Sequence, residues 1–286
     1  MNLAFEQLPS RVQAPPPTKP YDRWVLPDGE EASLFFREDD EYIVRFPDVA
    51  DFRISLERQV VRCWPAPGIS DRDIADKYFN QIVPLVMVCN GELVLHASAV
   101  TIGETAIAFL GPSRRGKSTL AAAFAQAGHP FLTDDGLILD HDGANYMVRP
   151  RAPILRLCSD SEAAILQGPG PAPNEEGNIK RPVQAGGEFA HSEQPAPLGS
   201  LYLLTEPQRV DGPQIAPLSQ PEALAELLRH SFILDVEDRD RVRSLFNRLV
   251  DVVGSVECFG LDYPRRFPRL PSVLSAIMTH AYREVK

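Results

Sequence analysis

The first part of the chain is patterned as short β-strands. After an opening segment, apolar and polar residues alternate in three runs separated by turns rich in Asp, Glu and Gly: 33–36, 42–46 and 52–56. Alternation with a period of two is typical of half-buried antiparallel strands. Residues 71–88 then have the composition of a helix, with Ser70 or Asp71 as its N-cap. We therefore predict a small β-rich module with one helix over residues 21–88.

From residue 89 onward, apolar runs that suit buried strands alternate with longer segments of helical periodicity. The predicted strands are 93–100, 105–110, 131–135, 137–140, 201–204 and 256–261. The predicted helices are 118–127, 221–230, 238–253 and 271–282. Strands that alternate with helices indicate an α/β fold, and we predict one such domain over residues 89–286.

Two segments lack this patterning. Residues 1–20 contain a run of three prolines at 15–17 and a further one at Pro20, and we predict a poorly ordered arm. Residues 168–199 are crowded with Pro, Gly, Glu and Gln and have little apolar periodicity. A segment of this length and composition is typical of a mobile loop beside an active site.

Composition and charge limit the class of protein. The chain has 286 residues, 44% of them hydrophobic and 24% charged, which suffices for one sizeable core and a smaller one. The formal net charge of −10 argues against a nucleic-acid partner, because such domains usually carry a basic face. The longest apolar stretch, 81–88, is too short to cross a bilayer, and the N-terminus lacks a signal-peptide pattern. We therefore predict a cytoplasmic protein without a membrane partner.

Residues 111–118 carry the strongest chemical signal in the sequence. They read Gly-Pro-Ser-Arg-Arg-Gly-Lys-Ser and fill every fixed position of the phosphate-binding G-x-x-x-x-G-K-[ST] loop. The predicted strand 105–110 runs into this loop, and the predicted helix 118–127 leaves it with Gly128 as its C-cap. Strand, loop and helix thus occur in the order that the motif requires.

Such a loop binds a nucleoside triphosphate. Successive backbone N–H groups form a concave site for anions, and the helix N-terminus adds partial positive charge. Lys117 is expected to reach the β- and γ-phosphates of ATP, and the Ser118 hydroxyl to hold Mg²⁺. We predict that the nucleotide is bound by the loop and the start of the helix: Gly111, Ser113, Arg114, Arg115, Gly116, Lys117, Ser118 and Thr119. The side chains of Arg114 and Arg115 are expected to point outward, toward an acidic peptide or a neighbouring subunit.

Two adjacent carboxylates, Asp134 and Asp135, form the second chemical signal. They follow the loop helix in the next strand-like segment, which places them near the phosphates at the carboxyl end of the sheet. There, one carboxylate could take the proton of a hydroxyl while the other helps to hold the metal. An Asp-Asp-Gly sequence is also a common solvated turn, and Asp140 is a competing metal ligand. His96 ends an apolar run and is, from the sequence alone, a strand-end histidine bonded to the backbone.

Three segments together resemble the catalytic domain of HPr kinase/phosphorylase: 95–99, 111–118 and 127–135. This family of bacterial serine kinases has a P-loop fold related to that of PEP carboxykinase. The resemblance implies an HPr kinase/PEP carboxykinase-like α/β domain that uses ATP and Mg²⁺ to phosphorylate a serine of a peptide or small protein. It further implies Asp134 as general base, Asp135 as its helper or as a metal ligand with Ser118, His96 near the reacting centre, and assembly as a homo-oligomer.

The sequence also departs from that family. Thr119 stands where true HPr kinases usually have Glu, and their glutamate-, arginine- and glycine-containing phosphorylase signature is absent after the acidic pair. The reverse, phosphorylase reaction is therefore not expected. The N-terminal module differs from the family's regulatory domain, and divergent relatives occur in lasso-peptide gene clusters, where they phosphorylate a C-terminal serine of the precursor. A lasso-peptide precursor is therefore one acceptor that the resemblance suggests, beside HPr-like and other small proteins.

Other functions are compatible with the same residues. A nucleotide-sensing P-loop ATPase could use Asp140 for Mg²⁺ and act on a partner without phosphorylating it. A kinase for a small metabolite is a third interpretation, because nothing in the sequence defines the acceptor site. Cations that could stabilise the transferring group lie beside or within the segment 168–199: Arg149, Arg151, Arg156, Lys180 and Arg181.

Overall fold

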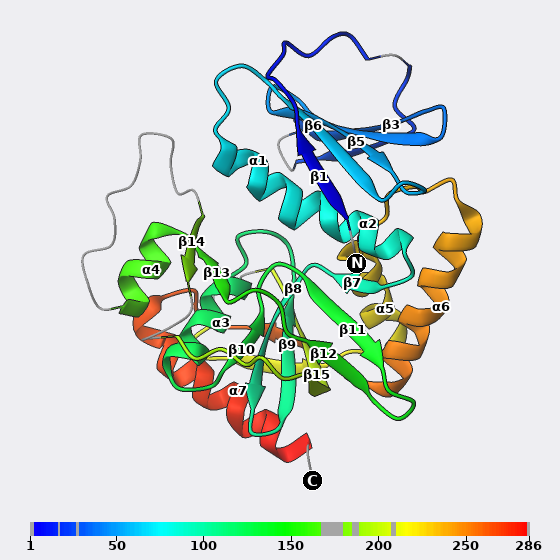
Figure 1. Cartoon of the computed structure of the whole chain (residues 1–286). Helices are drawn as coiled ribbons and strands as arrows, with labels where there is room; N and C mark the ends of the chain where they lie inside the picture. Colours follow the sequence, from blue (N-terminus) through cyan, green and yellow to red (C-terminus); the bar gives the residue numbers. More distant parts are fainter. Residues whose placement is uncertain are drawn as a thin grey trace. The chain divides into compact units, whose positions relative to one another are not determined.

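The computed structural model describes residues 3–16, 18–26, 29–166, 180–184, 189–206 and 210–284. The chain divides into two compact units with different architectures (Figure 1). Unit 1 comprises Met1–Gly91 and Ile233–Val242, and unit 2 comprises Glu92–Phe232 and Arg243–Lys286. Together they make a mixed α/β fold with several sheets.

Unit 1 is built on a six-stranded sheet in the order β1-β6-β5-β4-β3-β2. Its strands are β1 (Ala4–Gln7), β2 (Asp22–Val25), β3 (Glu31–Glu38), β4 (Glu41–Phe46), β5 (Ala50–Ser55) and β6 (Val60–Pro65). The strands from β2 to β6 pair antiparallel with their neighbours. Phe35, Val44 and Phe52 lie opposite one another on adjacent strands and are fully buried, so the predicted antiparallel strands are present.

The helical segment after this sheet is interrupted. Helix α1 (Asp71–Lys77) begins with Ser70 as its N-cap, whose side chain accepts a hydrogen bond from the Asp73 N–H. A π-helical turn over Tyr78–Ile82 follows, and α2 (Val83–Cys89) completes the segment. Pro84 has no N–H to donate to the carbonyl one turn earlier, which is a physical reason for the irregularity at this point.

The described residues of the N-terminal segment, 3–16 and 18–20, include regular structure, whereas their prolines predict a poorly ordered arm. Ala4–Gln7 form β1, which pairs in parallel with β6 at the edge of the sheet. The Phe5 ring stacks on Tyr78 with 4.1 Å between centroids, and the Gln13 side chain donates to Asp51 at 2.9 Å. Composition does not reveal this outcome, because the segment is held by the open edge of β6 and by side chains far along the sequence.

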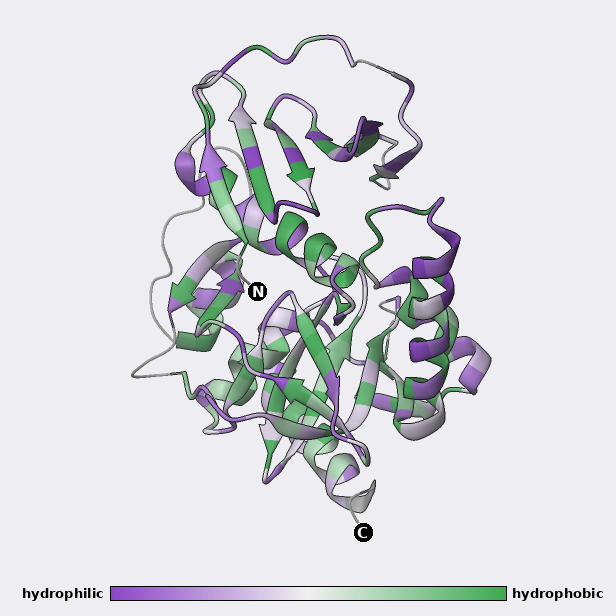
Figure 2. Cartoon of the chain, turned by 45° about the vertical axis from the view of Figure 1, so that its right-hand side comes forward, coloured by the Kyte–Doolittle hydropathy of each residue, from purple (hydrophilic) through white to green (hydrophobic). Residues whose placement is uncertain are grey.

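Unit 2 is built on a nine-stranded sheet. Most of this sheet follows the order β10-β8-β9-β15-β12-β11-β7, and β17 and β16 extend it from β15. The strands are β7 (Leu93–Leu95), β8 (Ala97–Ile102), β9 (Thr105–Leu110), β10 (Phe131–Thr133), β11 (Leu137–His141), β12 (Tyr146–Arg149), β15 (Ala196–Leu204), β16 (Gln214–Pro217) and β17 (Glu257–Asp262). The parallel neighbours β9, β15 and β17 are largely buried and mainly hydrophobic. Figure 2 shows hydrophobic residues, in green, along strands of the chain. Of the three parallel strands, β9 runs directly into the phosphate-binding motif at 111–118.

The helices of unit 2 lie between and after these strands in the chain. They are α3 (Lys117–Gln126), α4 (Ser159–Leu166), α5 (Gln220–Arg229), α7 (Leu270–Glu284) and all but the start of α6 (Arg239–Ser255). Helices α3 and α7 pack against each other and share one core cluster with Phe109, Tyr202 and Phe259. The predicted strand 105–110 and the predicted helix after the loop are confirmed to within one residue. Within the described ranges, no helix has both the length and the apolarity to cross a membrane.

The apolar run predicted as one strand over 93–100 is two strands in the structure. β7 pairs with β11, whereas β8 pairs with β9 and β10, so the chain changes partners at His96. The His96 N–H donates to the His230 carbonyl at 2.7 Å. Hydrophobicity does not reveal the change, because both strands are fully buried.

The segment predicted as a mobile loop over 168–199 contains regular structure. β14 (Arg181–Gln184) pairs antiparallel with β13 (Ile154–Leu157), and β15 begins at Ala196. The Val183 side chain packs against the core of unit 2, which explains why a polar, Pro-rich stretch contains a strand. Two stretches of the segment lie outside the described residues: 168–179 and 185–188.

Candidate active site

The loop between β9 and α3 is held in a tight turn. Gly111 and Gly116 have positive φ angles of 148° and 97°, a conformation that favours glycine. A Cβ atom on Gly116 would lie 2.5 Å from the Tyr263 hydroxyl oxygen, and one on Gly111 would lie 3.0 Å from Leu204 Cβ. Neighbouring side chains thus fix the loop backbone, and the N-terminus of the ten-residue helix α3 follows directly. The unpaired N–H groups of a helix start suit an anion such as phosphate.

Lys117, the lysine of the motif, is buried beside the loop. Its Nζ donates to the carbonyl of Gly111 at 2.7 Å and to that of Pro112 at 3.2 Å. Burial, only partly offset by the charge of Asp135, lowers the pKa of Lys117 to about 8. The side chain therefore remains mostly charged at neutral pH and provides an ammonium group next to the loop for phosphate oxygens.

Asp134 and Asp135 lie at the same edge of the sheet as the loop. β8 is antiparallel to both β9 and β10, so β9 and β10 run in the same direction and end at the same edge. The loop follows the end of β9, and the acidic pair follows the end of β10. Both residues are buried, with exposures of 9% and 6%, which excludes the solvated turn.

Asp134 is tied to the serine of the loop. It accepts hydrogen bonds from Ser118 Oγ at 2.9 Å, from Ser98 Oγ at 2.5 Å and from the Arg156 backbone N–H at 2.8 Å. Burial and the neighbouring charge of Asp135 raise the pKa of Asp134. Because both of its carboxylate oxygens already accept hydrogen bonds, Asp134 is suited to fixing Ser118 in place.

Asp135 lies beside two cations and a histidine ring. Its carboxylate lies 3.3 Å from Lys180 Nζ, 3.4 Å from Arg156 Nε and 4.0 Å from His96 Nε2. Burial alone would raise its pKa, but Lys180 and the other neighbouring positive groups lower the pKa of Asp135 below its usual value. The residue also has a φ angle of 61°, a left-handed conformation that Asp adopts more readily than most residues. This carboxylate is therefore held charged beside the loop.

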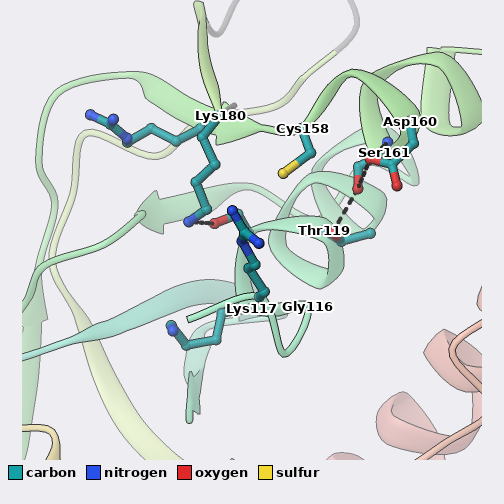
Figure 3. Close-up of a pocket in the computed structure, with 10 residues that line it drawn as sticks. Gly116, Lys117, Thr119, Cys158, Asp160, Ser161 and Lys180 are labelled. Atoms are coloured by element: carbon teal, nitrogen blue, oxygen red, sulfur yellow. Dashed lines mark hydrogen bonds between the residues drawn. The ribbon is translucent and has the colours of Figure 1, made fainter. Parts of the chain in front are cut away.

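The two-stranded sheet β13-β14 brings two cations to the acidic pair. Arg156 lies on β13 and Lys180 directly precedes β14. Lys180 Nζ also lies 3.2 Å from Ser118 Oγ, and Figure 3 shows its side chain reaching toward the loop. These residues and the loop line a cavity of about 190 Å³, whose wall also includes Thr119, Cys158 and Ser161. Both are among the five basic residues predicted to lie beside or within the segment 168–199. No sequence pattern distinguishes Arg156 and Lys180 from Arg149, Arg151 and Arg181.

The oxygen ligands beside this cavity fit Mg²⁺. No three His, Cys, Asp or Glu side chains of the described part of the chain are grouped to hold a metal by themselves. A nucleotide-bound Mg²⁺ needs only one or two protein oxygens, since phosphate and water supply the rest. Ser118 Oγ and the Asp135 carboxylate already face one cation, the Lys180 ammonium, at 3.2 to 3.4 Å. The position between them is therefore suited to positive charge.

His96 also lies beside Asp135, with its Nε2 4.0 Å from the carboxylate. Its ring packs edge-on against Phe232, with 6.3 Å between centroids, and 32% of its side chain is exposed. Burial and the positive charge of Lys117 lower the pKa of His96 to about 4, although Asp135 acts in the opposite direction. The ring is therefore neutral at pH 7 and offers one hydrogen-bond donor and one acceptor next to Asp135.

The structure does not bring Asp140 to this site. Asp140 forms an ion pair with Arg149 at 2.6 Å, and Arg149 also binds Glu92 at 2.5 Å. At about 3.3 Å per residue along a strand, Asp140 lies roughly 10 Å beyond Leu137, away from the end where Asp135 precedes β11. Asp140 and Arg149 therefore form a separate pair.

The remaining cations named from the sequence differ in position. The Arg151 guanidinium packs on Gly136, where a Cβ atom would lie 2.0 Å from its Nη1, and burial lowers its pKa. Arg115 forms an ion pair with Glu206 instead of pointing freely outward. Arg114 is exposed and lines the cavity. The side chain of Arg181 lies outside the described part of the chain.

The other two loop residues predicted to bind nucleotide also differ in environment. Thr119 Oγ1 lies 3.2 Å from Ser161 Oγ, and it lines the cavity at the first turn of α3. Ser113 is exposed within the loop. Thr119 therefore lines the cavity, and nucleotide binding by Thr119 and Ser113 stays a prediction.

His230 is a site residue that the sequence did not indicate. It follows α5 and is 9% exposed, and its Nε2 is buried with no hydrogen-bond partner among the residues that the structure describes. A carboxylate oxygen of Glu226 lies 3.8 Å from this nitrogen. Its carbonyl accepts the hydrogen bond that positions His96. Burial, with Lys117 and Arg229, lowers the pKa of His230 to about 4. A lone histidine after a helix carries no motif, so only the fold relates it to the site.

Acidification from pH 7.5 to 5 is expected to reduce the free energy of unfolding by about 2 kcal/mol through His230 alone. The pKa of His230 is about 4 in the folded state against an ordinary value of 6.5. The unfolded chain therefore binds the proton first, and stability present above pH 6.5 is lost as the pH falls toward 4. Urea unfolding of the wild type and of His230→Gln at both pH values measures the effect. The variant should lose about 2 kcal/mol less than the wild type; equal losses would contradict a buried neutral histidine.

Similarity to known proteins is slight. No protein-family model and no curated protein matches the chain. Among solved structures, the chain is similar to the Hpr(Ser) kinase/phosphatase from Coxiella burnetii, with a TM-score of 0.40 and 12% sequence identity. The likeness covers 68% of this chain and 99% of that chain. A likeness of this size supports no argument about activity, so the function is inferred from the geometry of the site.

Proposed function

We propose that this chain is an ATP- and Mg²⁺-dependent serine kinase that transfers the γ-phosphoryl group to a serine hydroxyl of a peptide or small protein. The observation that carries the proposal is the 2.9 Å hydrogen bond from Ser118 Oγ to Asp134, which joins the phosphate loop to the acidic pair. Lys117 and Ser118 are the loop residues that meet the β- and γ-phosphates and Mg²⁺. Phosphoryl transfer depends on charges positioned at that end of the nucleotide more than on covalent chemistry.

Asp134 and Asp135 have different roles in the proposed mechanism. Asp134 holds the Ser118 hydroxyl, which with phosphate oxygens would hold Mg²⁺; the metal would neutralise charge on the β- and γ-phosphates. Asp135 accepts the proton of the serine hydroxyl while that oxygen bonds to the γ-phosphorus and the bond to ADP breaks. These roles reverse the ones expected from the resemblance, because Asp134 already accepts three hydrogen bonds.

The neighbouring groups complete the mechanism. Arg156 and Lys180 lie within 3.4 Å of Asp135 and neutralise charge that builds up on the transferring group. His96, neutral at pH 7 and 4.0 Å from Asp135, is placed to hold the acceptor hydroxyl by a hydrogen bond. Arg156 and Lys180 are thus charges, and His96 a dipole, beside the carboxylate of Asp135.

The acceptor we propose is a peptide with a C-terminal serine, such as a lasso-peptide precursor. The support for it is that this chain, with its departures from true HPr kinases at Thr119 and in the N-terminal module, resembles the divergent HPr kinase-like proteins of lasso-peptide gene clusters. Assembly as a homo-oligomer remains a prediction from the same resemblance.

Incubation of the purified protein with γ-labelled ATP, Mg²⁺ and two peptide libraries tests the proposal. One library carries a single serine at the C-terminus and the other carries it internally; both have matched versions with Ala in its place. Label on phosphoserine that depends on the serine is the expected result. Release of free phosphate without any labelled peptide would instead support the nucleotide-sensing ATPase. That alternative assigned Mg²⁺ to Asp140, which is paired with Arg149.

A further inference from the structure

We propose that a second cavity next to the phosphate loop receives the nucleoside part of the triphosphate. It measures about 200 Å³ and lies between the loop, the start of α4 and the chain that leads into α7. This inference rests on one part of the proposed function, the binding of a nucleoside triphosphate by the loop. Nothing in the sequence motif defines where the base and ribose lie.

The two cavities are adjacent along the loop. Both are lined by Arg114, Gly116 and Thr119, so they meet at the point where the loop becomes α3. Taken together they reach the size of small-ligand sites, which begins at about 300 Å³. A single extended ligand can therefore follow the loop from one cavity into the other.

The direction of that ligand follows from which residues line only one cavity. Lys117, Ser118 and Lys180 line the first cavity but not the second. Lysine and serine of this motif meet the β- and γ-phosphates and Mg²⁺, so the γ end lies in the first cavity, near Asp135. The α-phosphate then lies toward Thr119 and the helix start, and the nucleoside continues into the second cavity.

The wall of the second cavity suits a flat, polarisable ring. Tyr263 is buried, and the Arg265 guanidinium stacks on its ring at 3.5 Å from the centroid. Phe267 and Leu270, both partly exposed, line the same cavity. Aromatic faces and guanidinium planes are the groups on which nucleobases stack.

The cavity combines positive charge with apolar surface. Of the four arginines that line it, Arg115 pairs with Glu206, and Arg265 lies 3.8 Å from an Asp262 oxygen. These acidic partners partly offset the charge of two of the four arginines. The aromatic and apolar surface from Phe267 and Leu270 stays accessible to a base.

Comparison of ATP with inorganic tripolyphosphate tests the proposal, because the two ligands share the phosphate chain and differ in the nucleoside. Titration calorimetry with each ligand in Mg²⁺ is carried out on the wild type and on Phe267→Ala. We expect Phe267→Ala to weaken ATP binding about tenfold, in the range found when a stacking aromatic is removed, and to change tripolyphosphate binding less than twofold. Phe267→Leu, which keeps apolar bulk without an aromatic face, should weaken ATP binding in the same direction and covers the case in which the alanine variant folds poorly.

Tyr282→Ala is the matched control, since Tyr282 is 54% exposed on α7 and does not line either cavity. It should change neither affinity. Unchanged ATP affinity in both Phe267 variants, or equal weakening of both ligands, would overturn the nucleoside site. If the wild type binds tripolyphosphate as tightly as ATP, the nucleoside site is wrong while the phosphate site stands. If it binds neither, the phosphate site and the proposed function fail with it.

Discussion

Asp135→Asn should reduce phosphoryl transfer by about a thousandfold while ATP binds no more weakly than to the wild type. The amide cannot take up the proton of the serine hydroxyl, and general bases contribute about 10²- to 10⁴-fold to rate. Binding is spared because the substitution removes a negative charge, lying 3.3 Å from Lys180, that repels the phosphates. Single-turnover transfer to a serine peptide, together with titration calorimetry for ATP, separates the two quantities.

Asp134→Asn is the matched comparison, since it makes the same chemical change one residue earlier. Asp134 holds Ser118 at 2.9 Å, so this variant should need a higher Mg²⁺ concentration for half-maximal activity and keep measurable transfer at saturating Mg²⁺. The opposite outcome, full activity in Asp135→Asn and none in Asp134→Asn at any Mg²⁺ concentration, would restore Asp134 as the base.

Lys117→Met should lower kcat/KM for ATP by about 10²- to 10³-fold, the range found when one preorganised donor to a developing charge is removed. Methionine has a similar length and no charge, so it loses the contact with the β- and γ-phosphates while filling the same buried space. Both ATP and tripolyphosphate should bind more weakly, in contrast to the Phe267 variants. Calorimetry with both ligands and steady-state kinetics with a serine peptide measure the effect.

Lys19→Met is the control for this substitution, because Lys19 is exposed in unit 1 and the side-chain change is identical. It should leave kcat/KM within twofold of the wild type. Thermal unfolding of both variants shows whether a loss of activity reflects misfolding. Wild-type ATP affinity in a folded Lys117→Met protein would remove the loop from the nucleotide site.

The sequence determined the parts of this protein that depend on neighbours along the chain. The strand Thr105–Leu110, the glycine turn and α3 follow from local hydrophobicity, backbone conformation and helix propensity, all of which are encoded within some twenty residues. The sequence also placed the acidic pair near the loop, because the pair follows the loop helix in the next strand-like segment. In the structure, β9 and β10 end at one edge because β8 pairs antiparallel with both.

Only the tertiary structure decided which side chains meet around that edge. Arg156 and Lys180 reach Asp135 through the pairing of β13 with β14, and His230 meets His96 because the chain changes sheet partners there. Composition gave the opposite expectation for Ala4–Gln7, which the open edge of β6 holds in place. The physical reason is the same in each case. Strand register and burial depend on residues far apart in sequence, and no local pattern specifies which of them pack together.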